Sequence, residues 1–440
     1  MTSSIAQRLR DALGAGPLAE LFPISAAGFL ERRSGDAALQ SLAGRSLAGL
    51  ARLLASQPQM AGFLSYRPAL LERIAQVGPD SLPARIRELE KWSPEGGATD
   101  LEAALDALRV LRREETCLVA CLDLGGWISF EEAARFLSIL AEIVAQQALA
   151  LAEAVVSTTP ASRELAVIGM GKIAGREFTY HSDLDLIFLY RGEVEVMAEV
   201  SRVAQRLIAY LTTMTGAGVA YAVDTRLRPS GQQGVLVTSF ETFTRYQTDR
   251  AQRWEHVALL RARPIGGAIA AGQEVLDAVH ARILAPHEPP WSELAELRNR
   301  VESERGGESD RAVPYKTGAG GLMDVDFLAS GGLLERGAER FPALPSVPAL
   351  LRAAVAGPRV DTLLDDYAFL RLVEARARWC AGRALEGLRS APEALEPVAE
   401  LALPGSDGAA LLERVASTRR RIREAYDAVI RSGSIAALEA

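Results

Sequence analysis

The chain has 440 residues, of which 49% are apolar and 24% charged, and its formal net charge is −7. This composition is ordinary for a globular protein with a large core, and the length allows two or three domains. The acidic balance excludes non-specific binding to a nucleic acid backbone, which needs a basic stripe, but it does not exclude a nucleotide as substrate.

The N-terminal segment, the apolar stretches and the cysteines indicate the cellular compartment. The N-terminal residues lack the apolar segment of a signal peptide. The most apolar long stretch, Leu137–Val156, contains Glu142 and Glu153, which suits a buried helix better than a membrane span. Three cysteines in so long a chain indicate a reducing compartment. We therefore expect a cytoplasmic protein without a membrane partner.

The first part of the chain, residues 1–157, predicts a helical domain. Apolar residues recur at helical spacing in Leu42–Leu54, Leu101–Leu118 and Phe130–Val156. The sequence Ser-Thr-Thr-Pro at 157–160 then predicts a joint between domains.

Residues 158–315 predict an α/β domain, and residues 316–440 predict a helical bundle with a helix at Tyr367–Ala381. In the α/β domain we expect strands at 165–168, 184–190, 219–223 and 234–237, and a helix at 196–214. A further helix is expected to start with Thr238 as N-cap and Glu241 at the N3 position. The fold class is therefore α+β, predominantly helical, with the α/β domain between two helical domains.

Gly169, Gly171 and Ala174 follow the first predicted strand and fit the loose G-x-G-x-x-A form of a dinucleotide-binding turn. That fold needs a helix of about three turns before the next strand. Only Lys172–Ser182 separate the glycines from the second strand, and they include Phe-Thr-Tyr, which are poor helix formers. We therefore reject the dinucleotide interpretation.

Two carboxylates open the second strand, at Asp183 and Asp185. Side chains alternate along a strand, so both acids face one side while Leu184 faces the core. Paired carboxylates favour a hard divalent cation such as Mg²⁺ or Mn²⁺, which completes its shell with water and substrate phosphates. Asp224, on the next predicted strand, is the candidate third ligand, or the base that accepts a proton from an acceptor hydroxyl.

The glycine turn is expected to hold phosphate oxygens through its backbone N–H groups. Only three of the 49 basic residues are lysines, Lys91, Lys172 and Lys316, and the last two stand within G-M-G-K-I-A-G and just before T-G-A-G-G. Because Arg226 and Arg228 alternate with Asp224, we expect them to share its face and to neutralise a leaving group. The predicted nucleotide-binding residues are Gly169, Gly171, Lys172, Ser182, Arg226, Arg228 and Lys316.

Structural interpretations of these residues stay open. Asp183 alone is consistent with a strand cap, and Asp224 with an arginine partner. His181 is expected to face solvent. Cys117 and Cys121 are expected to be small core residues, because no second pair or nearby histidine completes a metal site.

The motifs together resemble a known family. The sequences G-M-G-K-I-A-G-R-E-F-T-Y-H-S-D-L-D-L-I-F-L-Y, V-D-T-R-L-R-P-S-G, W-E-H-V-A-L-L-R-A-R and K-T-G-A-G-G-L-M-D-V-D-F resemble the glutamine synthetase adenylyltransferases. The wider resemblance is to the nucleotidyltransferase superfamily, which implies a central domain like the palm of DNA polymerase β.

The resemblance implies metal-dependent transfer of AMP from ATP to a tyrosine hydroxyl of glutamine synthetase. It also implies responses to glutamine and to the PII signalling protein. Asp183, Asp185 and Asp224 match the family's acids, and Gly169, Gly171, Lys172 and Ser182 match its nucleotide loop. A second glycine turn, with Lys316, is followed by Asp324 and Asp326, for which a direct and a structural role are equally open.

This sequence departs from the family in having one such set of motifs where family members usually have two. We therefore expect either a fragment or a single-headed relative. The alternatives are phosphorolytic removal of AMP from adenylylated glutamine synthetase, nucleotidyl transfer to another acceptor, and a non-catalytic regulatory module. Arg-Pro-Ser-Gly and Trp-Glu-His favour the adenylylating direction.

Overall fold

A computed structural model describes most of the chain. The described residues are 3–156, 164–229, 231, 234–285, 290–307, 312–337 and 341–439. The expected domain joint at 157–160 lies outside them, and the division into three domains at 157 and 315 stays a prediction.

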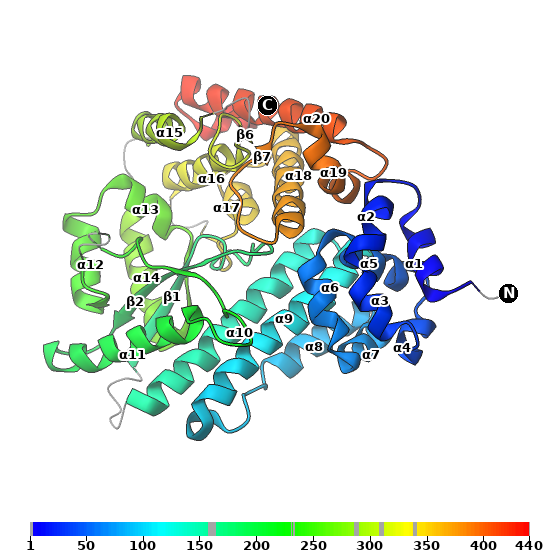
Figure 1. The fold of residues 1–440 in the computed structure, drawn as a ribbon. Coiled ribbons are helices and arrows are strands. Elements are labelled where there is room, and N and C mark those ends of the chain that lie inside the picture. Colours follow the sequence, from blue (N-terminus) through cyan, green and yellow to red (C-terminus); the bar gives the residue numbers. More distant parts are fainter. Residues whose placement is uncertain are drawn as a thin grey trace.

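Helices dominate the fold, as the sequence predicts (Figure 1). The N-terminal helices are α1 Ile5–Leu13, α2 Pro17–Ser25, α3 Ala27–Arg33, α4 Ala37–Ser41, α5 Gly44–Ser56, α6 Pro58–Ser65, α7 Pro68–Gln76, α8 Leu82–Leu89, α9 Leu101–Leu124 and α10 Phe130–Val156. The middle helices are α11 Val194–Thr212, α12 Phe240–Asp249, α13 Arg253–Leu259, α14 Ile269–Ile283 and α15 Trp291–Arg305. The C-terminal helices are α16 Leu322–Arg336, α17 Val347–Ala354, α18 Pro358–Ala381, α19 Glu396–Ala402 and α20 Gly408–Ser432.

A small mixed sheet packs against α10 on one face and α14 on the other. It is formed by β1 Leu165–Met170, β2 Leu184–Tyr190, β3 Val223–Asp224, β4 Val237–Ser239 and β5 Ala262–Gly267. The strand β1 pairs antiparallel with both β2 and β5. On its other edge, β2 pairs in parallel with two short strands. The first residues of β2 pair with β3, and its last residues pair with β4. The remaining two strands, β6 Ala312–Val313 and β7 Leu388–Arg389, form a separate pair.

The sheet separates two hydrophobic cores. One core joins the N-terminal helices to one set of sheet residues, including Val167 and Phe188. The other joins the alternate residues, such as Ile168 and Ile187, to the C-terminal helices. Because side chains alternate along a strand, the nearly continuous apolar sequence of β1 and β2 supplies both cores. The sheet that carries the candidate acids is therefore covered on both faces.

The long apolar stretch of the sequence forms α10, which is the one helix in the described residues long and apolar enough to cross a membrane. This helix packs against α9, α11 and β5, and Gln146 donates a hydrogen bond of 2.7 Å to the backbone oxygen of Ile265 in β5. Cys117 and Cys121 are buried in the same core, as expected. The helix is thus part of the protein interior.

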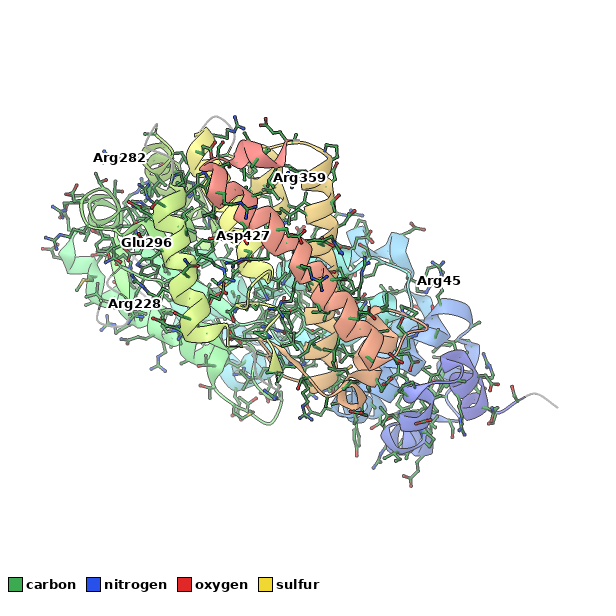
Figure 2. The ribbon with its side chains drawn as sticks, turned by 90° about the horizontal axis from the view of Figure 1, so that it is seen from above. Arg45, Arg228, Arg282, Glu296, Arg359 and Asp427 are labelled. Atoms are coloured by element: carbon green, nitrogen blue, oxygen red, sulfur yellow. The ribbon has the colours of Figure 1, made fainter. Side chains whose placement is uncertain are left out.

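The other face of the sheet is covered by α12 and α14, and the same core continues into the C-terminal helices. Figure 2, seen from above, shows α20 lying across α18 and α16. Asp407 begins α20 by accepting a 2.8 Å hydrogen bond from the N–H of Ala410, a standard N-cap. The buried helix α18 carries charged side chains on its inner face, and these reach the glycine turn described below.

Three local predictions are wrong. Residues 219–222 do not form a strand, because the N–H groups of Ala220 and Tyr221 both donate to Leu211 at the end of α11. The strand expected at 234–237 begins only at Val237. Thr238 pairs with Leu189 in the sheet, so Ser239 is the N-cap of α12 and accepts from the N–H of Thr242 at 3.2 Å.

Candidate active site

The glycine turn follows β1 directly. Gly171 has a φ of +60°, a left-handed conformation that favours glycine, and its N–H donates to the Arg261 oxygen at 2.8 Å. A Cβ atom at Gly169 would lie 2.8 Å from Ile173 and 2.9 Å from Ile265, too close for any side chain. Residues 171–176 form successive turns and no long helix, as the rejection of the dinucleotide interpretation requires.

The candidate acids come together at the start of β2. Parallel pairing sets Asp185 directly opposite Asp224 of β3, and Leu184 between Asp183 and Asp185 is fully buried. Asp183 is exposed at the end of the strand. The glycine turn is adjacent, because a Cβ atom at Gly171 would lie 3.7 Å from Oδ2 of Asp185. The structure thus brings the turn and the carboxylates into one place.

The electrostatics of Asp185 reflect this crowding. Burial, together with the negative charges of Asp224 and Asp183, raises its pKa to about 6, although Lys316 and Lys172 oppose the shift. A buried carboxylate whose pKa is raised by neighbouring negative charges marks a place where a cation would be stabilised. Lys316 is 131 residues beyond Asp185 in the chain, so the fold brings Lys172 and Lys316 toward the same carboxylate.

Arg226 binds Asp224. Its Nε donates to Oδ1 and Oδ2 at 3.0 and 2.8 Å, and its backbone N–H donates to Oδ1 at 2.8 Å. The side-chain hydrogen bonds of Arg226 lower the pKa of Asp224, with burial opposing them. This is the arginine partnership that the sequence left open as a structural role for Asp224.

The expectation that Arg226 and Arg228 alternate on the strand is wrong, because β3 ends at Asp224. Arg226 folds back within the following turn. Arg228 donates to the backbone oxygens of Thr225 and Gly234, at 2.8 and 3.2 Å. Arg228 therefore closes the loop that follows β3.

The carboxylates only partly fit a metal ion. Two carboxylates side by side supply the oxygen ligands that Mg²⁺ and Mn²⁺ prefer. Within the described residues, however, no three His, Cys, Asp or Glu side chains lie close enough together to hold an ion. Arg226 binds both oxygens of Asp224, so a metal ion at this place would compete with the arginine for that carboxylate.

Lys172 is held by a buried carboxylate from the C-terminal half. Its Nζ lies 2.5 Å from Oε1 of Glu374 in α18. Burial lowers the pKa of Lys172, Glu374 raises it, and Arg371 and Arg378 lower it further. The predicted phosphate-binding lysine thus connects the glycine turn to α18.

Two other predicted nucleotide residues also have protein partners. The hydroxyl of Ser182 accepts a 3.0 Å hydrogen bond from the N–H of Thr179 and lies 3.0 Å from the Thr179 hydroxyl, which closes the loop before β2. Lys316 lies 3.1 Å from Glu386, and its side chain is 34% exposed. The side chain of Lys316 is therefore more exposed than that of Lys172, which is 22% exposed.

The second acid pair binds arginines. Asp324 pairs with the buried Arg298 and accepts a 2.7 Å hydrogen bond from the Gly320 N–H, which fixes the second glycine turn. Asp326 accepts from Arg261 at 2.7 and 3.0 Å. These contacts support a structural role for the pair.

The sequence analysis missed two buried carboxylates that support the site. Glu374 pairs with Lys172, Arg371 and Arg378. Glu177 accepts from Arg261 at 2.6 Å and from the Tyr367 hydroxyl at 3.0 Å. For Glu374 the available signal was the run of charged residues inside the otherwise apolar helix 358–381, since charges in a buried helix need partners.

Comparison with known proteins decides the family. A sequence model of the glutamate-ammonia ligase adenylyltransferases matches residues 47–278, from α5 to α14. The chain belongs to this family.

Two relatives from this family show how much of such a protein the chain represents. A bifunctional glutamine synthetase adenylyltransferase/adenylyl-removing enzyme of Chromobacterium violaceum is 33% identical over 368 residues, which are 79% of this chain and 40% of that protein. The protein of the same name from Bordetella bronchiseptica is 30% identical over 427 residues, 93% of this chain and 43% of that protein. The chain thus spans about two-fifths of the length of these relatives.

Proposed function

We propose that the protein transfers AMP from ATP to a tyrosine hydroxyl of glutamine synthetase. The observation that carries the proposal is the pairing of Asp185 with Asp224 beside the turn at Gly171. Family membership and the names of the relatives support the choice of reaction and of protein substrate. On this proposal the protein is a cytoplasmic enzyme, and the PII protein is a candidate regulator.

The reaction forms a bond between the tyrosine oxygen and the α-phosphorus of ATP and breaks the bond between the α-phosphorus and the bridging oxygen. Pyrophosphate leaves, and the tyrosyl proton passes to a carboxylate at the site or to solvent. A divalent ion, Mg²⁺ or Mn²⁺, would be held by Asp183, Asp185 and Asp224. When bound, it would stabilise negative charge on the phosphate oxygens.

The protein's own groups position the nucleotide. Backbone N–H groups of the turn after β1, other than that of Gly171, which donates to Arg261, would hold phosphate oxygens at close approach. Lys316, whose charge already acts on Asp185, would bind the departing pyrophosphate as a compact point charge. Lys172 would keep the turn in place through Glu374.

A transfer assay tests the proposal. The protein is mixed with ATP labelled at the α-phosphate, Mg²⁺ and glutamine synthetase, and label in the synthetase is counted. We expect transfer by the parent and a loss of at least about a hundredfold in Asp183→Asn and Asp185→Asn. The exposed Asp361, at the start of α18, supplies the control Asp361→Asn, which should retain parental activity.

A second arm tests the opposite direction. Adenylylated glutamine synthetase is incubated with the protein and inorganic phosphate, and released ADP is measured. ADP release without forward transfer would assign phosphorolytic removal of AMP instead. Failure in both directions, with intact folding, would contradict both activities and leave the regulatory module as the account to test.

A further inference from the structure

A cavity of about 370 Å³ lies next to the loop that leads into β2. Its wall is built by α6, α9, the loop 178–182 and the segment 214–221 before β3. Ser182 is part of the wall, but the glycine turn and the three candidate acids are not. The cavity is therefore a separate space that borders the candidate active site.

Positive side chains and apolar groups line this cavity. Arg112 and Arg113 come from successive positions of α9, and no Asp or Glu is among the described residues of the wall. Met60, Leu137 and Phe178 supply apolar surface. In a protein with a net charge of −7, a cavity with arginines and without acids is selective for negative ligands.

The positive charge of Arg113 has a favourable contact with an aromatic ring and is opposed by neighbouring arginines. Its guanidinium lies 4.2 Å from the ring centre of Phe63. Burial and the positive charges of Arg112 and Arg67 lower its pKa. An anion beside Arg113 would relieve this repulsion.

The nearest acids along α9 are bound elsewhere. Glu115 is fully buried and pairs with Arg73 and Arg85, and Glu114 lies 3.2 Å from Arg73. Both acids therefore pair with arginines of other helices, and neither pairs with Arg112 or Arg113.

Arg112 is fixed in position before any ligand arrives. It donates a 3.2 Å hydrogen bond to the oxygen of Val219, and its guanidinium lies 4.7 Å from the ring centre of Tyr221. A cation held this way loses little side-chain entropy when it binds an anion.

His181 completes the polar wall, where it is half-buried and only partly faces solvent. It adopts a φ of +57°, unusual for a residue other than glycine. An imidazole in the wall can exchange hydrogen bonds with a polar group of a ligand.

We propose that this cavity binds a small molecule through an oxyanion group, a carboxylate or a phosphate, held by Arg112 and Arg113. The apolar wall takes the body of the ligand. Since His181 and Ser182 line the cavity and Asp183 follows them in the chain, the bound molecule contacts the segment that places the first acid. The site is independent of AMP transfer and stands whether or not the protein performs that reaction.

Calorimetric titration tests the site with three probes at constant ionic strength. Inorganic phosphate and succinate carry the oxyanion, and succinamide is the neutral analogue of succinate. The parent is expected to bind at least one anion and not succinamide. Preference between phosphate and succinate then identifies the oxyanion.

Variants locate the binding. Arg113→Gln should weaken binding at least about tenfold, and Arg113→Lys less, because one charged contact is lost or replaced. Arg87→Gln, at an exposed arginine of α8, should bind like the parent. Thermal unfolding of each variant checks that it folds. Equal affinity in Arg113→Gln and the parent, or no binding of either anion to the parent, would overturn the proposal.

Discussion

Asp185 of β2 and Asp224 of β3 are register partners in a parallel strand pair, so the structure sets two carboxylates side by side next to a glycine turn. The repulsion is real, because burial and the charge of Asp224 raise the pKa of Asp185 to about 6. This arrangement costs stability in the protein without metal. We infer that it is kept for binding a cation.

The first prediction concerns the pH dependence of stability. A folded-state pKa of about 6, against an ordinary value of 3.8, means that the folded state binds more protons between these values. The contribution of Asp185 therefore destabilises the protein as pH rises from about 4 to about 6. Asp185→Asn should raise the free energy of unfolding at pH 7 by roughly 1 kcal/mol.

Urea denaturation with a chelator present measures this effect at pH 4 and pH 7. The difference between Asp185→Asn and the parent should disappear near pH 4, where the carboxyl of the parent is protonated. A variant less stable than the parent at pH 7 would show that Asp185 is a structural residue.

The second prediction concerns Arg226, which occupies both oxygens of Asp224. Arg226→Gln removes this competing cation, so Mn²⁺ should bind several-fold more tightly. Electron paramagnetic resonance of free Mn²⁺ measures the affinity directly. The control is Arg206→Gln on the exposed face of α11, which changes the net charge equally. Equal affinity in both variants would mean that Arg226 does not compete for Asp224.

The third prediction concerns the support of Lys172. Glu374 is fully buried and pairs with Lys172, Arg371 and Arg378. Glu374→Gln leaves these cations without their carboxylate and should lower the free energy of unfolding by about 3–5 kcal/mol. Glu413→Gln, at an exposed position of α20, should change it little.

The same variant has a signature in acid. Burial would raise the pKa of Glu374, but the charges of Lys172, Arg371 and Arg378 lower it overall. The carboxylate therefore stabilises the protein above about pH 4.5, and this stabilisation is lost as pH falls further. In Glu374→Gln, the free energy of unfolding should therefore depend less on pH below about pH 4.5. A parallel curve in parent and variant would assign the acid sensitivity to other groups.

The fourth prediction separates two of the three lysines. Lys316→Gln removes a charge that acts on Asp185 and should weaken ATP binding roughly tenfold if the lysine contacts phosphate. Lys91→Gln, at an exposed lysine outside the site, is the matched control. Fluorescence titration with an ATP analogue measures both. Similar affinities would place Lys316 outside the nucleotide site.

Sequence patterns predicted the parts of the site that are local. The apolar sequences of 165–168 and 184–190, with acids at the start of the second, located β1, β2 and Asp185. The position of Asp224 followed from the next strand, although that strand has only two paired residues. Alternation and apolar runs are local properties, and they predict local structure well.

Long-range partners were not predicted, because their physical cause lies in packing. Lys172 and Glu374 are 202 residues apart, and nothing near Lys172 in the sequence indicates a carboxylate. The turn after Asp224 was not predicted either, because the sequence does not show that β3 ends at Asp224. Arg226 reaches Asp224 only because the chain turns at this point. The cap of α12 shifted by one residue because Thr238 is used by the sheet.

The most direct test of the central claim is the mass of glutamine synthetase after incubation with the protein, ATP and Mg²⁺. The account predicts that the parent and Asp361→Asn add one adenylyl group at a tyrosine, and that Asp185→Asn and Asp224→Asn leave the mass unchanged. Adenylylation by Asp185→Asn at the parental rate would contradict the role of the paired carboxylates.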